Sequence, residues 1–223
     1  QYQPRYVIHL AAQTQVLRAD RDPLETYESN TRATWRLLEA CRGWESLEGI
    51  LVASTDKVYG HSPPPYREDT ALRPVAPYEV SKAAADWIAA SYGRHYGLPV
   101  IITRCGNIYG PGDLNEERLI PGVCRALLGG REPQLRSTGS MTREWLFVSD
   151  VVRAIMLLLR SAQSHRGQAF NIGGGEVSSV REIVETLCSL SGAEVAAVYQ
   201  PSDPEGEIPH QSLVTEKIKT LGW

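Results

Sequence analysis

Tyr78 and Lys82 lie four residues apart in an apolar stretch that has the composition of a helix. This spacing stacks two side chains on one helix face, so a phenol and an ammonium are expected to point at the same place. A phenol with an unperturbed pKa of about 10 is a poor base near neutral pH, but a neighbouring ammonium favours the phenolate and lowers that pKa. The pair therefore predicts a general base, Tyr78, that Lys82 activates. Taken alone, the motif is equally open to chance spacing on a helix.

The elements that would carry this pair alternate between strands and helices. The expected strands are 6–12, 49–53, 99–104, 133–136, 145–148 and 169–173, and the expected helices are 22–42, 77–96, 119–129, 149–162 and 179–191. This alternation predicts an α/β fold with a parallel, doubly wound sheet, in which 6–12 is a buried strand. Ligands of such sheets bind outside the carboxyl ends of the strands, where the polar segments 54–60 and 105–112 lie. The residues expected to face the sheet are Val80, Ala84, Trp87, Ile88 and Ser91, and the tail 201–209 is expected to loop over the surface.

Composition excludes several classes of function. The 223 residues are 42% apolar and 22% charged with a net charge of −3, which is typical of a soluble globular protein. A net negative charge gives no basic field for nucleic acid or for an anionic membrane. The four cysteines are dispersed and show no metal-ligand spacing to the five histidines, which favours free thiols in the cytoplasm and no metal site.

Five segments, in order along the chain, together resemble a known group of enzymes. They are His9-Leu10-Ala11-Ala12, Ser54-Thr55-Asp56-Lys57-Val58-Tyr59-Gly60, Pro77-Tyr78-x-x-Ser81-Lys82, Arg104-x-x-Asn107-x-Tyr109-Gly110-Pro111 and Arg143-Glu144-Trp145-Leu146-Phe147-Val148-x-Asp150. The chain thereby resembles the extended short-chain dehydrogenase/reductases of the NAD-dependent epimerase/dehydratase family, over nearly its whole length. The resemblance implies a Rossmann-type NAD-binding domain over 1–112, to which 146–173 returns, and a smaller nucleotide-sugar-binding lobe mainly over 113–223.

The resemblance also implies roles for single residues. Tyr78 would take the proton from the sugar 4-hydroxyl, Lys82 would hydrogen-bond the nicotinamide ribose and Thr55 would hydrogen-bond the reacting hydroxyl. The expected cofactor-binding residues are Leu10, Ala11, Ala12, Gln13, Ala53, Ser54, Tyr78 and Lys82. The expected grip on the substrate diphosphate is Asn107, Arg143 and Arg118, and a planar guanidinium matches phosphate oxygens well. For Arg143 a surface ion pair with Glu144 is the alternative.

Asp56 points to one reaction within this group. In 4,6-dehydratases an aspartate at this place protonates the C6 oxygen as it leaves, whereas simple 4-epimerases usually lack a carboxylate there. Lys57 departs from the best-known dehydratases, which have a glutamate, and makes Thr55-Asp56-Lys57 most similar to the CDP-glucose 4,6-dehydratase type. The base for the C5 proton stays open between Lys57 and Tyr78. For Asp56 alone, a structural turn residue is the alternative.

The expected protein is therefore a cytoplasmic lyase that uses NAD on a nucleotide-diphosphate sugar, and a homodimer through the helix of Tyr78. A nucleotide-sugar 4-epimerase and a non-catalytic NAD-binding scaffold are the alternatives. The glycine-rich pyrophosphate loop that opens such domains does not occur in the sequence. Roughly 60–80 preceding residues are expected to carry it, at about 30 or more residues per βαβ unit.

Overall fold

The computed structural model describes residues 4–223 and consists of two sheets flanked by helices. The larger sheet has the order β1-β2-β3-β6, and all its pairs are parallel. Its strands are β1 Tyr6–His9, β2 Gly49–Ala53, β3 Val100–Cys105 and β6 Gln168–Ile172. The smaller sheet has the order β4-β5-β7, with β4 Asn107–Tyr109, β5 Thr142–Phe147 and β7 Val177–Ser179. The expected parallel α/β sheet is therefore confirmed.

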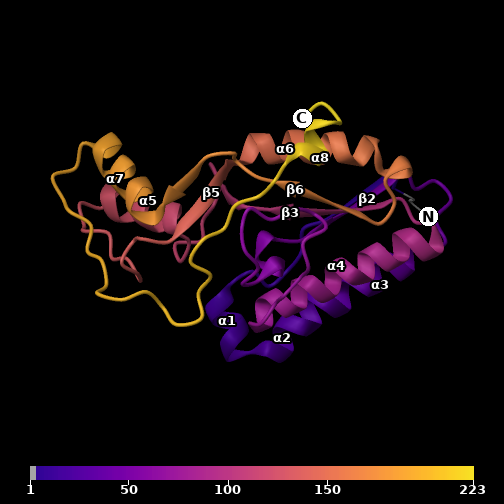
Figure 1. Cartoon of the computed structure of the whole chain (residues 1–223), viewed down its shortest axis with the longest axis horizontal. Coiled ribbons are helices and arrows are strands. Elements are labelled where there is room, and N and C mark those ends of the chain that lie inside the picture. The colour runs from indigo at the N-terminus through magenta and orange to yellow at the C-terminus, as the bar shows by residue number, and fades with distance from the viewer. Residues whose placement is uncertain (1–3) are drawn as a thin grey trace.

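Helices cover both faces of the larger sheet, with α3 and α4 on one side and α6 and α8 on the other (Figure 1). The helices are α1 Val16–Arg21, α2 Pro23–Tyr27, α3 Ala33–Cys41, α4 Pro77–Tyr96, α5 Leu119–Leu128, α6 Val148–Arg160, α7 Val180–Ser191 and α8 Glu216–Lys219. Successive strand residues point to opposite faces. Ile50 and Ile102 accordingly join the core beneath α3 and α4, whereas Ile101 joins the core beneath α6.

The first strand is less buried than its apolar sequence predicts. In β1, Tyr6 is 40% and Ile8 is 45% exposed, because β1 forms an edge of the sheet in the described chain and no helix covers its outer side chains. The strand ends at His9, and residues 10–15 form a loop before α1, a helix that the sequence pattern did not predict.

Helix α4 has the predicted bounds but presents a different face to the sheet. Trp87 is 58% exposed, whereas Ala85, Ala89 and Gly93 are buried. Small residues let the helix axis approach the strands closely, and a Cβ on Gly93 would lie 2.2 Å from the backbone nitrogen of Gly167. The expected sheet-facing set is therefore wrong in part: Trp87 and Ser91 are exposed, whereas Ile88 packs against the core beneath α3 and α4.

The smaller sheet, α5 and α7 make a lobe at one end of the molecule (Figure 1). The expected strand at 133–136 is reduced to a single bridge between Gln134 and Val198. Helix α6 begins at Val148 after the N-cap Phe147, one residue before the predicted start. None of the helices within residues 4–223 has the length and apolarity that crossing a membrane requires.

Candidate active site

The carboxyl ends of β2 and β3 and the start of α4 enclose a pocket of about 750 Å³, which we call the strand-end pocket. Its volume lies within the range of roughly 300–1,000 Å³ that is usual for small-molecule sites. The predicted site residues that line it are Ser54, Thr55, Asp56, Lys57, Tyr78, Asn107, Arg118 and Arg143. The fold therefore brings residues from four separated motifs to one cavity.

Asp56 begins a short 3-10 turn, Asp56–Tyr59, that leaves the end of β2. The hydroxyl of Thr55 caps this turn by accepting from the backbone nitrogen of Lys57 at 3.3 Å, and it donates to Asp56 Oδ1 at 3.1 Å. Burial raises the pKa of Asp56, against the opposing charges of Lys57 and Arg143. The carboxyl is thus biased toward its protonated form, in which it can donate a proton.

Tyr78 and Lys82 are both buried near the start of α4, and burial shifts the pKa of each toward its neutral form. Burial and the charge of Asp56 raise the pKa of Tyr78 to about 12, while a hydrogen bond with Thr55 and the charge of Arg118 act in the opposite direction. The ammonium of Lys82 donates to the carbonyl oxygen of Ala53, and burial lowers the pKa of Lys82 to about 8. In this structure the pKa of Tyr78 is therefore raised rather than lowered, and activation of Tyr78 by Lys82 stays a prediction.

A buried ion pair fixes the turn that carries Asp56. Arg104 on β3 donates two hydrogen bonds to Asp86 on α4, at 2.8 and 3.0 Å, and a third to the hydroxyl of Tyr59 at 2.9 Å. Tyr59 in turn donates to Asn171 on β6 at 2.7 Å. Two strands, α4 and the end of the 3-10 turn are thereby joined. The sequence motif singled out Arg104 without indicating this positioning role.

A second buried contact fixes α4 to the loop that follows β1. Asn30 donates to the hydroxyl of Ser81 at 2.9 Å and accepts from the backbone nitrogen of Gln13 at 2.7 Å. Ser81 donates to the carbonyl oxygen of Tyr78 at 2.7 Å. Asn30 therefore sets the position of the helix turn that presents Tyr78.

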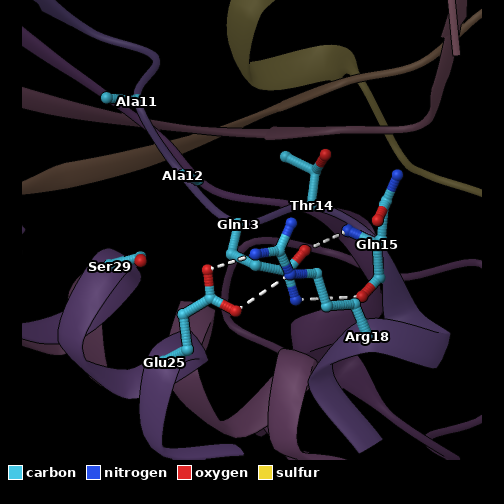
Figure 2. A pocket seen from close by; sticks show the side chains of 8 residues that line it. All are labelled: Ala11, Ala12, Gln13, Thr14, Gln15, Arg18, Glu25 and Ser29. Atoms are coloured by element: carbon cyan, nitrogen blue, oxygen red, sulfur yellow. Dashed lines mark hydrogen bonds and ion pairs between the residues drawn. The ribbon is translucent and has the colours of Figure 1, made fainter. Parts of the chain in front are cut away.

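Most of the expected cofactor residues of the loop after β1 line a second cavity, which shares Thr14 and Gln15 with the strand-end pocket. Ala11, Ala12 and Gln13 line this smaller cavity, the loop pocket, whose wall contains an ion pair between Arg18 and Glu25 at 2.6 Å (Figure 2). The other lining residues are Thr14, Gln15 and Ser29. Leu10 is 60% exposed and lines neither of these two pockets.

The residues expected to grip a diphosphate bind other parts of the chain. Arg143 is 6% exposed and donates to the carbonyl oxygens of Thr142 and Pro209. Its ion-pair partner is Glu207 at 3.2 Å, so the alternative of a surface pair with Glu144 is wrong. Arg118, which lines the same pocket, pairs with Asp113 at 2.7 Å.

Sequence reasoning missed Glu207, which the tail brings to the strand-end pocket. Its Oε1 accepts from Lys57 at 3.0 Å as well as from Arg143 at 3.2 Å, and the tail is held nearby by Asp203, which accepts from Thr138 at 2.8 Å. Burial raises the pKa of Glu207, but the charges of Lys57 and Arg143 outweigh it and hold the pKa below its usual value. The tail therefore forms part of the pocket wall rather than only covering the surface. No local signal marks this residue, because its partners are far away in the sequence.

Comparison with known proteins gives one family. The model of the "NAD dependent epimerase/dehydratase family" matches residues 1–173. The dTDP-glucose 4,6-dehydratase 1 of Escherichia coli (strain K12) is 34% identical over 250 residues, which cover all of this chain and 68% of that protein. The dTDP-glucose 4,6-dehydratase of Salmonella typhimurium is 36% identical with the same coverage.

Two solved structures show how far the likeness extends in space. The DesIV double mutant, a dTDP-glucose 4,6-dehydratase of Streptomyces venezuelae with NAD and DAU bound, is 34% identical with a TM-score of 0.88 and covers 98% of this chain and 67% of its own. The UDP-glucose 4-epimerase of Thermotoga maritima with UDP-glucose is 28% identical with a TM-score of 0.90 and covers 99% and 72%. The curated dehydratases carry dTDP-glucose in their names and do not support the expected CDP-glucose type.

Proposed function

Because the chain belongs to the NAD dependent epimerase/dehydratase family, we propose that it is a nucleotide-diphosphate-sugar 4,6-dehydratase. Membership establishes the coarser statement, an NAD-dependent enzyme that is a nucleotide-sugar dehydratase or epimerase. The observation that supports dehydration is Asp56, a buried carboxyl with a raised pKa in the same pocket as Tyr78. Epimerisation at C4 has no leaving group to protonate, whereas loss of the C6 hydroxyl requires such an acid.

The residues at the strand ends fit the ribose of a nicotinamide dinucleotide. The hydroxyl of Ser54 is buried and has no hydrogen-bond partner within residues 4–223, and the ammonium of Lys82 lies beside it at the carbonyl of Ala53. Buried polar atoms are rarely left unpaired, so these groups suit the hydroxyls of a bound ligand. Lys82 and Ser54 would hold the cofactor here, with Ala11 and Ala12 along the loop pocket. NAD, when bound, supplies the hydride acceptor for C4 of the sugar and the hydride donor for C6.

Side chains of this protein carry out the proton transfers of the proposed reaction. As the phenolate, Tyr78 accepts the proton of the sugar 4-hydroxyl; the hydrogen bond with Thr55 and the charge of Arg118 favour that ionised form, against the burial that raises its pKa. Asp56 then donates its proton to the oxygen that leaves C6, and water is lost. The C4 ketone formed in the first step makes this elimination possible, because it acidifies the neighbouring C5 proton.

The two sheets suggest separate regions for binding the cofactor and the sugar nucleotide. We assign cofactor binding to residues 1–112 with 146–173, whose described strands β1, β2, β3 and β6 form the larger sheet, and sugar binding mainly to 113–223. The curated relatives favour a dTDP-glucose-like donor. The homodimer through α4 stays a prediction, which sedimentation at micromolar concentration tests.

The test is incubation of the NAD-loaded full-length protein with dTDP-glucose, CDP-glucose and UDP-glucose in parallel, followed by mass spectrometry of the sugar nucleotides. A 4,6-dehydratase gives a product lighter by one water. A 4-epimerase, which the Thermotoga maritima structure keeps as the second candidate, gives a new sugar of unchanged mass. A binding scaffold leaves every donor unaltered, and Tyr78→Phe would then show no activity to lose.

A further inference from the structure

We propose that Glu207 is the base that removes the C5 proton of the sugar, an inference that rests on the proposed dehydratase function. Its carboxylate lines the strand-end pocket and accepts from Lys57, the residue next to Asp56, at 3.0 Å. The tail thus places a proton acceptor in the same pocket as Asp56 and in contact with Lys57, its neighbour in the sequence.

The two acceptors considered from the sequence are unsuited to this step. Lys57 is bound as a donor to Glu207, and a charged amine has no lone pair with which to take a proton. Tyr78 already holds the proton of the 4-hydroxyl once C4 has been oxidised. Neither group is free to act as a base when the C5 proton must leave.

The other carboxylates of the pocket wall are placed differently. Asp56 must be protonated to act as the acid, and burial favours that form by raising its pKa. Glu116 pairs with Arg125 at 2.8 Å on an exposed surface, and Glu117 is exposed in the loop before α5. Glu207 is the pocket carboxylate that contacts the turn of Asp56, through Lys57.

Its two cationic partners suit Glu207 to this particular proton. Lys57 and Arg143 keep the carboxylate ionised at neutral pH, so it is ready to accept. A proton next to a ketone does not need a strong base, and carboxylates of nearly ordinary pKa remove such protons in other enzymes.

The proton and electron balance of the step is complete without a further reagent. The C5–H bond breaks, its proton goes to Glu207 and its electron pair forms the C4 enolate. The enolate then collapses, the C5–C6 double bond forms, the C6–O bond breaks and the departing oxygen takes the proton of Asp56 as water. Glu207 ends protonated and Asp56 ends ionised, so one proton has been accepted and one donated.

Glu207→Gln separates this role from a structural one, because the amide keeps the shape and can still accept from Lys57 and Arg143. Full-length, NAD-loaded protein would be mixed with dTDP-glucose in deuterated water. Reduction of the bound cofactor reports oxidation at C4, and nuclear magnetic resonance reports deuterium at C5 and loss of water. We expect cofactor reduction to stay near wild type, while C5 exchange and water loss fall by about 10²- to 10⁴-fold. Glu205→Gln, the same change on an exposed tail residue, should behave as wild type.

Glu207→Asp is the second variant, because it keeps the negative charge beside Lys57 and Arg143 but withdraws the carboxylate by one methylene. It should fold as wild type and slow C5 exchange more than cofactor reduction. The inference is overturned if Glu207→Gln exchanges C5 at the wild-type rate, or if it loses cofactor reduction and water loss equally. It is also overturned if Lys57→Met abolishes exchange while Glu207→Gln retains it. A wild type that never loses water refutes the proposed function instead, and the assignment with it.

Discussion

Asp86→Asn removes the charge that balances Arg104 beneath the candidate site, and its cost can be worked out from the structure. The two side chains are 2% and 7% exposed and are joined by hydrogen bonds of 2.8 and 3.0 Å. The amide leaves the guanidinium buried without a counter-charge. Breaking a buried pair in this way costs about 3–5 kcal/mol, a large part of a total stability of about 5–15 kcal/mol.

The assay is unfolding in urea and by heat, with circular dichroism as the signal. For a domain of this size each kcal/mol moves the midpoint by about 2–4 °C, so Asp86→Asn should unfold about 6–20 °C below wild type. Glu28→Gln is the matched control, because its pair with Arg32 is exposed and should cost less than about 1 kcal/mol. An Asp86→Asn variant that unfolds together with Glu28→Gln would refute the reasoning.

Three further predictions concern burial. Burial raises the pKa of Tyr59, Tyr66 and Tyr78 to about 12. The stability that these neutral phenols contribute below pH 10 should therefore be lost as the pH rises through about 12. An absorbance titration in which all ten tyrosines ionise together near pH 10 would contradict this. Gly93→Ala places a Cβ 2.2 Å from the backbone nitrogen of Gly167 and should lower the free energy of unfolding in urea by at least about 1–3 kcal/mol. Gly43→Ala is the control: no atom lies within 4 Å of its Cβ, so its free energy of unfolding should stay within about 0.5 kcal/mol of wild type. Ser54→Ala removes a buried hydroxyl that has no hydrogen-bond partner within residues 4–223, so the unfolding midpoint of the ligand-free protein should stay the same or rise. Calorimetry should show weaker NAD binding by this variant. Equal NAD affinity would refute the assignment of Ser54 to the cofactor site.

The sequence predicted those elements whose ends carry their own signals. Helix α4 begins at Pro77, where a proline is favoured, and Glu79 accepts from the backbone nitrogen of Val75 at 3.0 Å in the first turn. It ends before Gly97, whose φ of 72° suits glycine. The strand 49–53 was predicted equally well, because a short apolar run that begins at a glycine is typical of a buried strand.

Which face of α4 packs against the sheet was harder to predict. Apolar residues lie on both sides of α4, and apolar periodicity favours the side of Trp87 over the small residues that pack on the sheet. The spacing of Tyr78 and Lys82 predicted that both side chains lie on one helix face. It could not predict that the ammonium of Lys82 donates to the carbonyl oxygen of Ala53. Burial then shifts both pKa values toward the neutral forms, an effect that no spacing reveals.

Contacts between distant segments could not be predicted at all. Glu207 meets Lys57 and Arg143 only because the tail crosses the strand-end pocket, and an acidic residue in a tail rich in Pro, Asp and Glu has no local feature that marks it. The residues of the motifs 54–60 and 104–111 could be placed together because these motifs lie at the ends of β2 and β3, and strand ends of a parallel sheet meet at one edge.

The central claim is that Tyr78 and Asp56 serve successive steps in one pocket, and a single turnover tests it most directly. Wild type, Tyr78→Phe and Asp56→Asn, each loaded with NAD, would be mixed with the sugar nucleotide that wild type turns over. Cofactor absorbance and product mass would be followed together. The account predicts that Asp56→Asn reduces the cofactor but forms little product lacking water, whereas Tyr78→Phe does neither. An Asp56→Asn variant that releases water at the wild-type rate would contradict the account.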